Sequence, residues 1–278
     1  MSLIAHISDL HFGHHDEAIA RALLADLRAA EPTVIALSGD LTQRARRVEF
    51  AAARRFLDAL PAPVIIVPGN HDVPLYNLSR RLFTPLRRYH RFITAERYPF
   101  FQNDDIAVLG IDTVRSIAVS NGRISDRQLL EIRGIFDQVP TGRLRVLVTH
   151  HPLVPPPDAP DRPILRHAIP ALSAIEAAGV DLLLAGHYHH SYIAEVGAFH
   201  RTVDRSILVA QAGTAISTRT RAEENAYNLI STASTGLSCR VRMFRSDRFV
   251  DGPDTRFDRV AGRWRVADSP PMQPSEPC

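Results

Sequence analysis

The 278-residue sequence contains no lysine, so all 33 of its basic side chains are arginines. Without lysine the chain cannot form a Schiff base with a carbonyl substrate, and it cannot supply the lysine of a P-loop. Only two cysteines occur, Cys239 and Cys278, which are too few for a disulfide framework and do not have zinc-finger spacing. Lysine catalysis is therefore excluded, and sulfur chemistry is not expected.

Long apolar runs are also absent. No run approaches the roughly 20 residues that a membrane-spanning helix requires, and the polar stretch HISDLH begins too close to Met1 for a cleavable signal peptide to precede it. We expect a cytoplasmic protein with no membrane partner. The net charge is only +3, and arginines alternate with acidic residues along most of the chain. This pattern favours a solvated surface over a nucleic-acid-binding stripe.

Apolar runs of strand length alternate with stretches of helical periodicity, which indicates an α/β fold with a mainly parallel sheet flanked by helices. After residue 197 the pieces become short and β-like, which predicts a second, more antiparallel sheet packed on the first. We predict strands at 3–8, 33–38, 63–68, 106–111, 144–149 and 180–185, helices at 17–30, 48–60 and 124–136, and later β pieces at 205–213, 226–232, 239–245 and 262–266.

The composition of the remaining segments predicts their structure. Residues 73–100, rich in arginine and aromatic residues, are predicted to form a helical excursion beside the site. The many prolines of 151–163 predict a stiff loop. We expect one domain over residues 1–265, followed by a disordered tail over 266–278.

Every predicted strand except 106–111 runs directly into acidic, amide or imidazole side chains. Because the carboxyl ends of parallel strands lie at one edge of a sheet, residues far apart in sequence should converge there. The side chains that follow the strands are Asp9 and His11, Asp40, Asn70 with His71 and Asp72, His150 and His151, and His187 and His189.

Carboxylate, amide and imidazole side chains without a thiolate suit Mn, Fe, Zn, Co or Ni. Even two aspartates, one asparagine and four histidines from this set are too many ligands for one ion, so a two-metal centre with one bridging carboxylate fits. Any one of these residues could be an ordinary polar residue at a strand end, but five such coincidences at successive strands favour metal binding. Core, surface or supporting roles are expected for the other histidines: His6, His14, His15, His90, His167, His190 and His200.

Five blocks occur in order: DLH at 9–11, GD at 39–40, GNHD at 69–72, THHP at 149–152 and GHYH at 186–189. Together they resemble the signature blocks of the calcineurin-like metallophosphoesterase superfamily. Within it, the chain is similar to bacterial class III cyclic-nucleotide phosphodiesterases and glycerophosphodiesterases. The resemblance implies two packed mixed β-sheets, a β-sandwich, flanked by helices in four α-β-β-α layers.

The resemblance also implies a role for each residue of the blocks. One metal would be held by Asp9, His11 and His189, the other by Asn70, His150 and His187, and Asp40 would bridge them. The THHP block selects His150 and leaves His151 pointing away. His71 would be a catalytic residue outside the metal ligands, with Asp72 orienting it.

The expected activity is hydrolysis of phosphodiester bonds by a hydroxide that two cations activate, with His71 as the general acid that protonates the leaving group. The substrate would be a cyclic nucleotide or another small phosphodiester, and nucleic acid is not expected. Arg219 in STRTR either reaches a substrate phosphate or is a solvated charge. The alternatives are a nuclease or a phosphomonoesterase of the same superfamily, or a metal-free protein-binding scaffold. The oligomeric state stays open, a homo-oligomer included.

Overall fold

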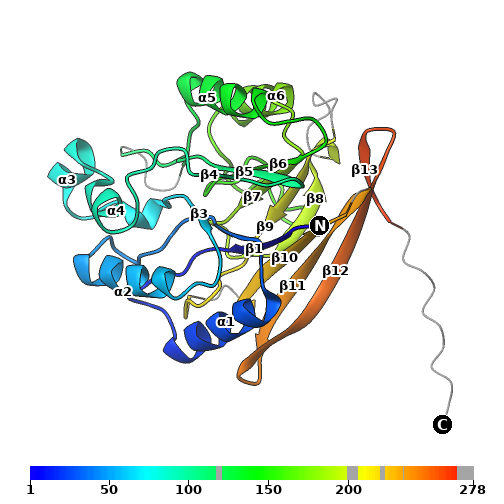
Figure 1. The fold of residues 1–278 in the computed structure, drawn as a ribbon. Helices are drawn as coiled ribbons and strands as arrows, with labels where there is room; N and C mark the ends of the chain where they lie inside the picture. Colours follow the sequence, from blue (N-terminus) through cyan, green and yellow to red (C-terminus); the bar gives the residue numbers. More distant parts are fainter. Residues whose placement is uncertain (117–120, 199–205, 220–222, 234, 268–278) are drawn as a thin grey trace, which may run out of the picture.

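Two β-sheets pack face to face in the computed structural model, which describes residues 1–116, 121–198, 206–219, 223–233 and 235–267 (Figure 1). The seven-stranded sheet has the order β13-β12-β11-β10-β1-β2-β3, and the six-stranded sheet has the order β4-β5-β6-β7-β9-β8. The first comprises β1 (Leu3–Ile7), β2 (Val34–Leu37), β3 (Val64–Ile66), β10 (Ala226–Thr232), β11 (Gly236–Arg245), β12 (Arg248–Val260) and β13 (Arg263–Val266). The second comprises β4 (Phe100–Gln102), β5 (Ile106–Gly110), β6 (Leu144–Val148), β7 (Leu182–Ala185), β8 (Tyr192–Glu195) and β9 (Leu208–Gln211).

Helices cover the outer face of each sheet. Figure 1 shows α1 (Glu17–Ala30) and α2 (Arg47–Asp58) on the seven-stranded sheet, and α5 (Asp126–Asp137) and α6 (Ala168–Ala177) on the six-stranded sheet. Because successive side chains of a strand point to opposite faces, Ile7 packs against the first pair of helices while Ile4 packs between the sheets. The result is the four-layer α-β-β-α arrangement that the resemblance implies.

The division of strands between the sheets differs from the sequence prediction. The parallel strands expected in one sheet are split, with β1, β2 and β3 in one and β5, β6 and β7 in the other. The antiparallel strands β10 to β13 extend the first sheet, and β9 lies parallel to β7 in the second. Strands that are buried on both faces have continuous apolar runs in either sheet, so the pattern does not reveal their neighbours.

The helices follow the predicted periodicity, with one omission. The helix predicted at 124–136 forms as α5, and the Ser125 side chain caps it by accepting from the Gln128 backbone. The predicted excursion contains α3 (Leu78–Phe83), α4 (Arg87–Phe92) and, just before it, the short 3-10 helix η1 (Asn70–Asp72). Helix α6 was not predicted, because its sequence AIPALSAIEA is apolar on most sides and has a proline in the first turn.

Two further observations concern the ends of the chain and the membrane. Strand β13 extends to Val266, so the predicted disordered tail starts too early, and residues 268–278 lie outside the described residues. No helix among the described residues is both long and apolar enough to cross a bilayer. That residues 1–265 form one domain stays a prediction.

Candidate metal centre

The seven predicted ligands meet where the carboxyl ends of strands from both sheets come together. Asp9, Asp40 and Asn70 follow β1, β2 and β3 of the first sheet. His150 follows β6, and His187 and His189 follow β7, of the second sheet. All of these strands end where the two sheets meet. The convergence predicted from sequence is therefore observed, although the residues come from the edges of two sheets instead of one.

Asp9, His11 and His189 form one group of buried side chains. Asp9 Oδ1 lies 3.2 Å from His189 Nε2 and 3.6 Å from His11 Nε2, and the two imidazole nitrogens are 3.2 Å apart. The other Asp9 oxygen, Oδ2, accepts from the Ser8 hydroxyl at 2.5 Å and from the His187 backbone at 3.0 Å. Asp9 Oδ1 itself accepts no hydrogen bond, so it is free to bind a cation.

Asn70, His150 and His187 form a second group. Asn70 Oδ1 lies 3.0 Å from both His150 Nε2 and His187 Nδ1, and these nitrogens are 3.3 Å apart. Asp40 lies between the two groups, with Oδ1 3.5 Å from His150 Nε2 and Oδ2 3.8 Å from His11 Nε2. Its Oδ1 also accepts from the His71 backbone at 2.8 Å.

The donor and acceptor roles of the imidazoles show that these groups fit cations. His150 Nδ1 lies 2.8 Å from the Ser38 carbonyl and His189 Nδ1 lies 3.0 Å from the Arg219 carbonyl. Because a carbonyl only accepts, each Nδ1 carries the proton and each neutral ring presents a bare lone pair at Nε2. His150 Nε2 then faces the Asn70 oxygen, which is another acceptor. Acceptors this close repel one another unless a positive charge lies between them.

The electrostatics hold Asp9 and His187 in the protonation states that metal ligands need. Burial opposes ionisation of Asp9, but the electrostatic effect of the nearby His189 outweighs it and holds the pKa of Asp9 well below its usual value. Burial, followed by the charge of His150, lowers the pKa of His187 to about 4. At neutral pH Asp9 is therefore a carboxylate and His187 a neutral imidazole, the forms that bind transition metals. Burial opposes protonation of His189, but the neighbouring Asp9 outweighs it and raises the pKa of His189.

Five of the seven side chains stand on backbone with a positive φ, a conformation that residues other than glycine rarely adopt. The φ values are 53° for Asp9, 48° for His11, 53° for Asp40, 79° for His187 and 58° for His189. Each residue follows the end of β1, β2 or β7 by no more than four positions. The left-handed conformation is therefore concentrated at the site.

Two glycines of the sequence blocks are required because the backbone approaches a ligand closely. A Cβ atom at Gly69 would collide with the Asp40 carboxylate, and one at Gly186 would collide with the Ser8 hydroxyl and the Asp9 carboxylate. The glycines of GNHD and GHYH therefore leave room for aspartates that come from other strands.

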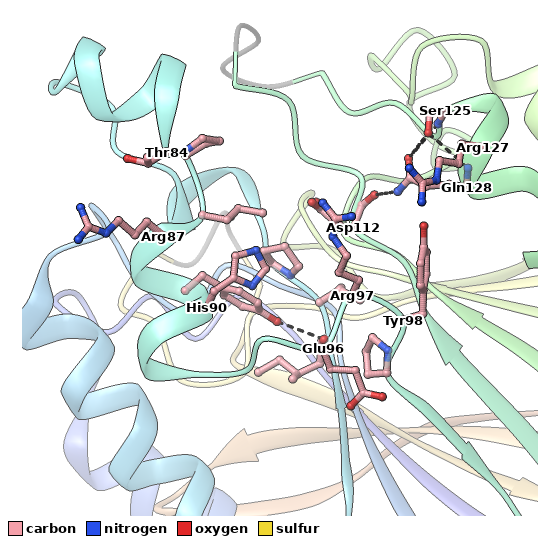
Figure 2. Close-up of a pocket in the computed structure, with 17 residues that line it drawn as sticks. Thr84, Arg87, His90, Glu96, Arg97, Tyr98, Asp112, Ser125, Arg127 and Gln128 are labelled. Atoms are coloured by element: carbon pink, nitrogen blue, oxygen red, sulfur yellow. Dashed lines mark hydrogen bonds between the residues drawn. The ribbon is translucent and has the colours of Figure 1, made fainter. Parts of the chain in front are cut away.

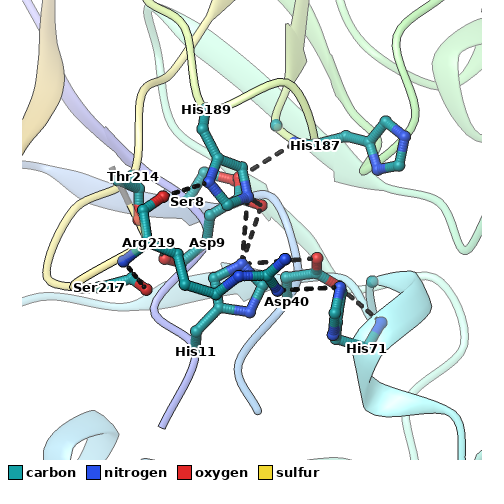
Figure 3. A network of polar contacts seen from close by, with 12 residues as sticks. Ser8, Asp9, His11, Asp40, His71, His187, His189, Thr214, Ser217 and Arg219 are labelled. Atoms are coloured by element: carbon teal, nitrogen blue, oxygen red, sulfur yellow. Dashed lines mark hydrogen bonds and ion pairs between the residues drawn. The ribbon is translucent and has the colours of Figure 1, made fainter. Parts of the chain in front are cut away.

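His71 lies at the edge of this centre, with its ring 4.9 Å from the His11 ring (Figure 3). Its Nδ1 donates to the Gln43 carbonyl at 2.8 Å, which leaves Nε2 facing the site. The structure corrects the expected role of Asp72. Among the described residues, its carboxylate accepts hydrogen bonds from Gly69, Leu41 and Thr42 rather than from the His71 ring. Asp72 joins two loops, and Gln43 orients the ring.

His151 does not point away from the centre. Its ring lies 4.9 Å from that of His150 and 5.0 Å from that of His187, and its Nδ1 is 2.8 Å from the Thr113 hydroxyl. The hydrogen bond with Thr113 turns the ring toward the ligand histidines and leaves Nε2 buried without a partner. Of the histidines outside the blocks, His6 is a fully buried core residue that bonds Ser38, and His200 lies outside the described residues.

Asp112 is a residue of this edge that the sequence analysis missed. It directly follows Ile111, the last residue of the strand predicted at 106–111, which the strand-end pattern did not include. Burial raises the pKa of Asp112 to about 6. Since Gly110 pairs with Val148, Asp112 and the candidate ligand His150 each lie two residues beyond this pair on neighbouring strands. The strand-end pattern that indicated the other residues also applies here.

Asp112 lines a cavity of about 600 Å³ (Figure 2). The cavity reaches Pro68, two residues before the candidate ligand Asn70, and its walls include Tyr98 and Arg97. A space of this size accommodates a small organic molecule.

The comparisons with known proteins agree with this geometry. The family model for calcineurin-like phosphoesterases matches residues 2–191. A glycerophosphodiester phosphodiesterase, GpdQ, from Enterobacter lignolyticus (strain SCF1) is 32% identical over 81 residues, which cover 25% of this chain and 29% of that protein. The match therefore spans less than a third of that relative's length.

Two solved structures share the fold at low sequence identity. The purple acid phosphatase PPD1 from yellow lupin (Lupinus luteus) seeds has a TM-score of 0.66 and 10% identity, over 90% of this chain and 52% of that one. A dimetal phosphatase from Danio rerio has a TM-score of 0.61 and 14% identity, over 90% of this chain and 98% of that one. With the family model matching well over half of the residues, the chain belongs to the calcineurin-like phosphoesterase family.

Proposed function

We propose that the protein is a binuclear-metal-dependent phosphodiesterase that acts on a small phosphodiester. The observation that carries the proposal is the pair of ligand groups, each with acceptor atoms facing one another, on either side of Asp40. Seven ligands exceed what one ion uses, and a carboxylate between the two groups suits a bridge.

In this proposal Asp9, His11 and His189 hold one ion, Asn70, His150 and His187 hold the other, and Asp40 contacts both. Mn, Fe, Zn and Co all suit this set of oxygen and nitrogen ligands. When bound, the two cations supply an activated water and neutralise charge on the phosphoryl oxygens.

The chain's own contribution to leaving-group departure is assigned to His71. Its Nδ1 proton is held by the Gln43 carbonyl at 2.8 Å, so the ring cannot rotate freely and Nε2 stays directed at the site. The imidazolium form carries a second proton at Nε2, and a proton donated from this atom would neutralise the leaving oxygen. Such general acid catalysis contributes roughly 10² to 10⁴ in rate.

Two observations support a diester over a monoester. A diesterase needs room for an organic group on both sides of phosphorus, and a cavity of about 600 Å³ has Pro68, two residues before Asn70, in its wall. The stretch similar to a glycerophosphodiester phosphodiesterase points in the same direction. A phosphomonoesterase is the alternative outcome of the assays.

The proposal is tested by metal analysis together with a substrate panel. Elemental analysis of unchelated protein should find close to two transition-metal ions per chain, lost on chelation and restored by Mn. Rates on bis-nitrophenyl phosphate, nitrophenyl phosphate, 3′,5′-cyclic AMP and glycerophosphodiesters should rank diesters above monoesters. A preference for nitrophenyl phosphate would replace the diesterase by a monoesterase, and one ion or none in active protein would remove the two-metal centre.

The role of His71 is tested by its dependence on the leaving group. His71→Ala should keep the metal content and lose most turnover of a diester with a poor alkyl leaving group, but lose much less with nitrophenolate, which needs little protonation. His167→Ala is a matched control, because this histidine is exposed at the start of α6. Equal losses with good and poor leaving groups would mean that His71 positions phosphate instead of donating a proton.

A further inference from the structure

Arg219, which follows β9 in the chain, lies between the candidate ligand His189 and His71. Its backbone carbonyl accepts from His189 Nδ1 at 3.0 Å, so the residue begins directly behind a candidate metal ligand. Its guanidinium Nη1 lies 3.4 Å from His71 Nε2 and 3.3 Å from Gln43 Oε1 (Figure 3). The side chain therefore spans the opening between the metal ligands and the proposed general acid.

The guanidinium is not neutralised there. Within the part of the chain that the structure describes, no acidic side chain forms an ion pair with Arg219, and its guanidinium makes two long contacts, to Gln43 Oε1 and to His71 Nε2. A guanidinium has five donors in a planar fork, which matches two oxygens of a phosphoryl group. A negatively charged oxygen is also a much stronger acceptor than an amide oxygen or a neutral imidazole.

The segment around Arg219 is fastened to the loop that carries the ligand histidines. We call residues 217–219 together with 223–225 the arginine arm. Ser217 Oγ accepts from the Arg219 backbone at 3.1 Å, and the Ser217 carbonyl accepts from Asn225 Nδ2 at 2.9 Å, which joins the two parts of the arm. The Glu223 carboxylate accepts from His190 Nδ1 and, at 3.1 Å, from the Ser191 backbone. His187 and His189 of GHYHH therefore belong to the ligand groups, whereas His190 contacts Glu223 of the arginine arm.

We propose that Arg219 binds the non-bridging phosphoryl oxygens of the substrate, and that the His190–Glu223 contact positions the arm from which it does so. The inference rests on the proposed phosphoesterase function. Arg219 and His71 would then contact different oxygens, because His71 acts on the leaving oxygen while the guanidinium stabilises charge that gathers on the others. Solvated charge, the alternative for Arg219, does not account for a side chain directed at His71.

The direct test is a calorimetric titration of metal-loaded protein with inorganic phosphate. Because a hydrogen bond to a charged group contributes more than a neutral one, Arg219→Ala should weaken phosphate binding about 10- to 100-fold. Arg219→Lys, which keeps the charge and loses the fork, should fall in between. Arg21→Ala, on the exposed face of α1, is the matched control and should bind phosphate as the wild type does. Elemental analysis should find the same metal content in all four proteins.

Turnover provides a second measurement. Loss of one donor to a developing oxyanion costs about 10² to 10³ in rate, so Arg219→Ala should lose that much on good and poor leaving groups alike. Guanidinium ion in solution should restore part of the lost rate in Arg219→Ala and none in Arg21→Ala. A loss confined to poor leaving groups would show that Arg219 serves His71 and would overturn the proposal, as would phosphate binding within twofold of wild type at full metal content.

The positioning role of Glu223 is tested by a double-mutant cycle. If Glu223 acts only through Arg219, Glu223→Gln should lower turnover in the wild type and add no further loss in Arg219→Ala. Additive losses would assign Glu223 a separate role and overturn that half of the inference. Should the wild-type protein hydrolyse no phosphoester, the proposed function would fail, while the phosphate titration would still decide whether Arg219 binds the anion.

Discussion

The left-handed backbone at five candidate ligands predicts an unusual response to glycine. His189 has a φ of 58°, whereas His150 does not have a positive φ. Replacing either histidine by alanine or by glycine removes the same imidazole, so metal binding is lost equally within each pair. The difference between the alanine and glycine variants then reports the backbone alone.

The expected difference in stability between the glycine and alanine variants has opposite signs at positions 189 and 150. Left-handed backbone costs an L-residue about 1–2 kcal/mol that glycine does not incur, and the flexibility of glycine in the unfolded chain costs about 0.5–1 kcal/mol. At position 189 the glycine variant should therefore be more stable than the alanine variant by roughly 0.5–1 kcal/mol. At position 150 it should be less stable by a similar amount, so the two differences should lie about 1–2 kcal/mol apart.

Equilibrium urea unfolding in the presence of a chelator, followed by circular dichroism, measures these differences. All four variants should be compared with His167→Ala, whose position lies outside the centre. If alanine were the more stable residue at both 189 and 150, the backbone at His189 would relax without its ligand, and the reasoning from its φ would be refuted.

Three further predictions follow from the same geometry. Asp40→Ala should lower metal content and activity more than Asn70→Ala, because only Asp40 faces both ligand groups; equal, mild losses in both assays would contradict this. Gly69→Ala should abolish metal binding, since its Cβ would displace the Asp40 carboxylate, and elemental analysis would show this. Burial raises the pKa of Asp112 to about 6, so its contribution to stability is full below about pH 4 and is lost as the pH rises to 6. Asp112→Asn should therefore gain up to about 3 kcal/mol of unfolding free energy over wild type between pH 4 and pH 7, measured by urea unfolding at each pH.

The location of the centre could be predicted from the sequence because its polar side chains directly follow buried strands. Polar side chains directly after buried apolar runs have few structural explanations, so Asp9, Asn70 and His187 could be assigned to one site from the sequence alone. The same rule covers Asp112, which was missed only because the strand before it was treated as an exception. The roles assigned to these residues remain predictions until the variants are measured.

Contacts between loops were beyond the reach of sequence patterns. The partner of His71 is a backbone carbonyl at Gln43, and any residue could supply that atom. The neighbouring aspartate Asp72 was the natural choice from sequence, but its carboxylate is used to join the turns that follow β2 and β3. The division of strands between the sheets was hidden for a related reason, since buried strands are apolar on both faces wherever they pair.

The meeting of two sheets at the centre has a mechanical consequence. Each proposed ion takes ligands from both sheets: Asp9 with His189 in one case, and Asn70 with His150 in the other. The two ions would therefore link the sheets at this edge, and the sheets could not separate there while both ions stayed bound. Removing the metals should loosen this edge before the rest of the molecule, with faster amide hydrogen exchange in the turns after β1 and β7 than at the far end of the sandwich. The atoms proposed for catalysis would then also hold the two halves of the fold together.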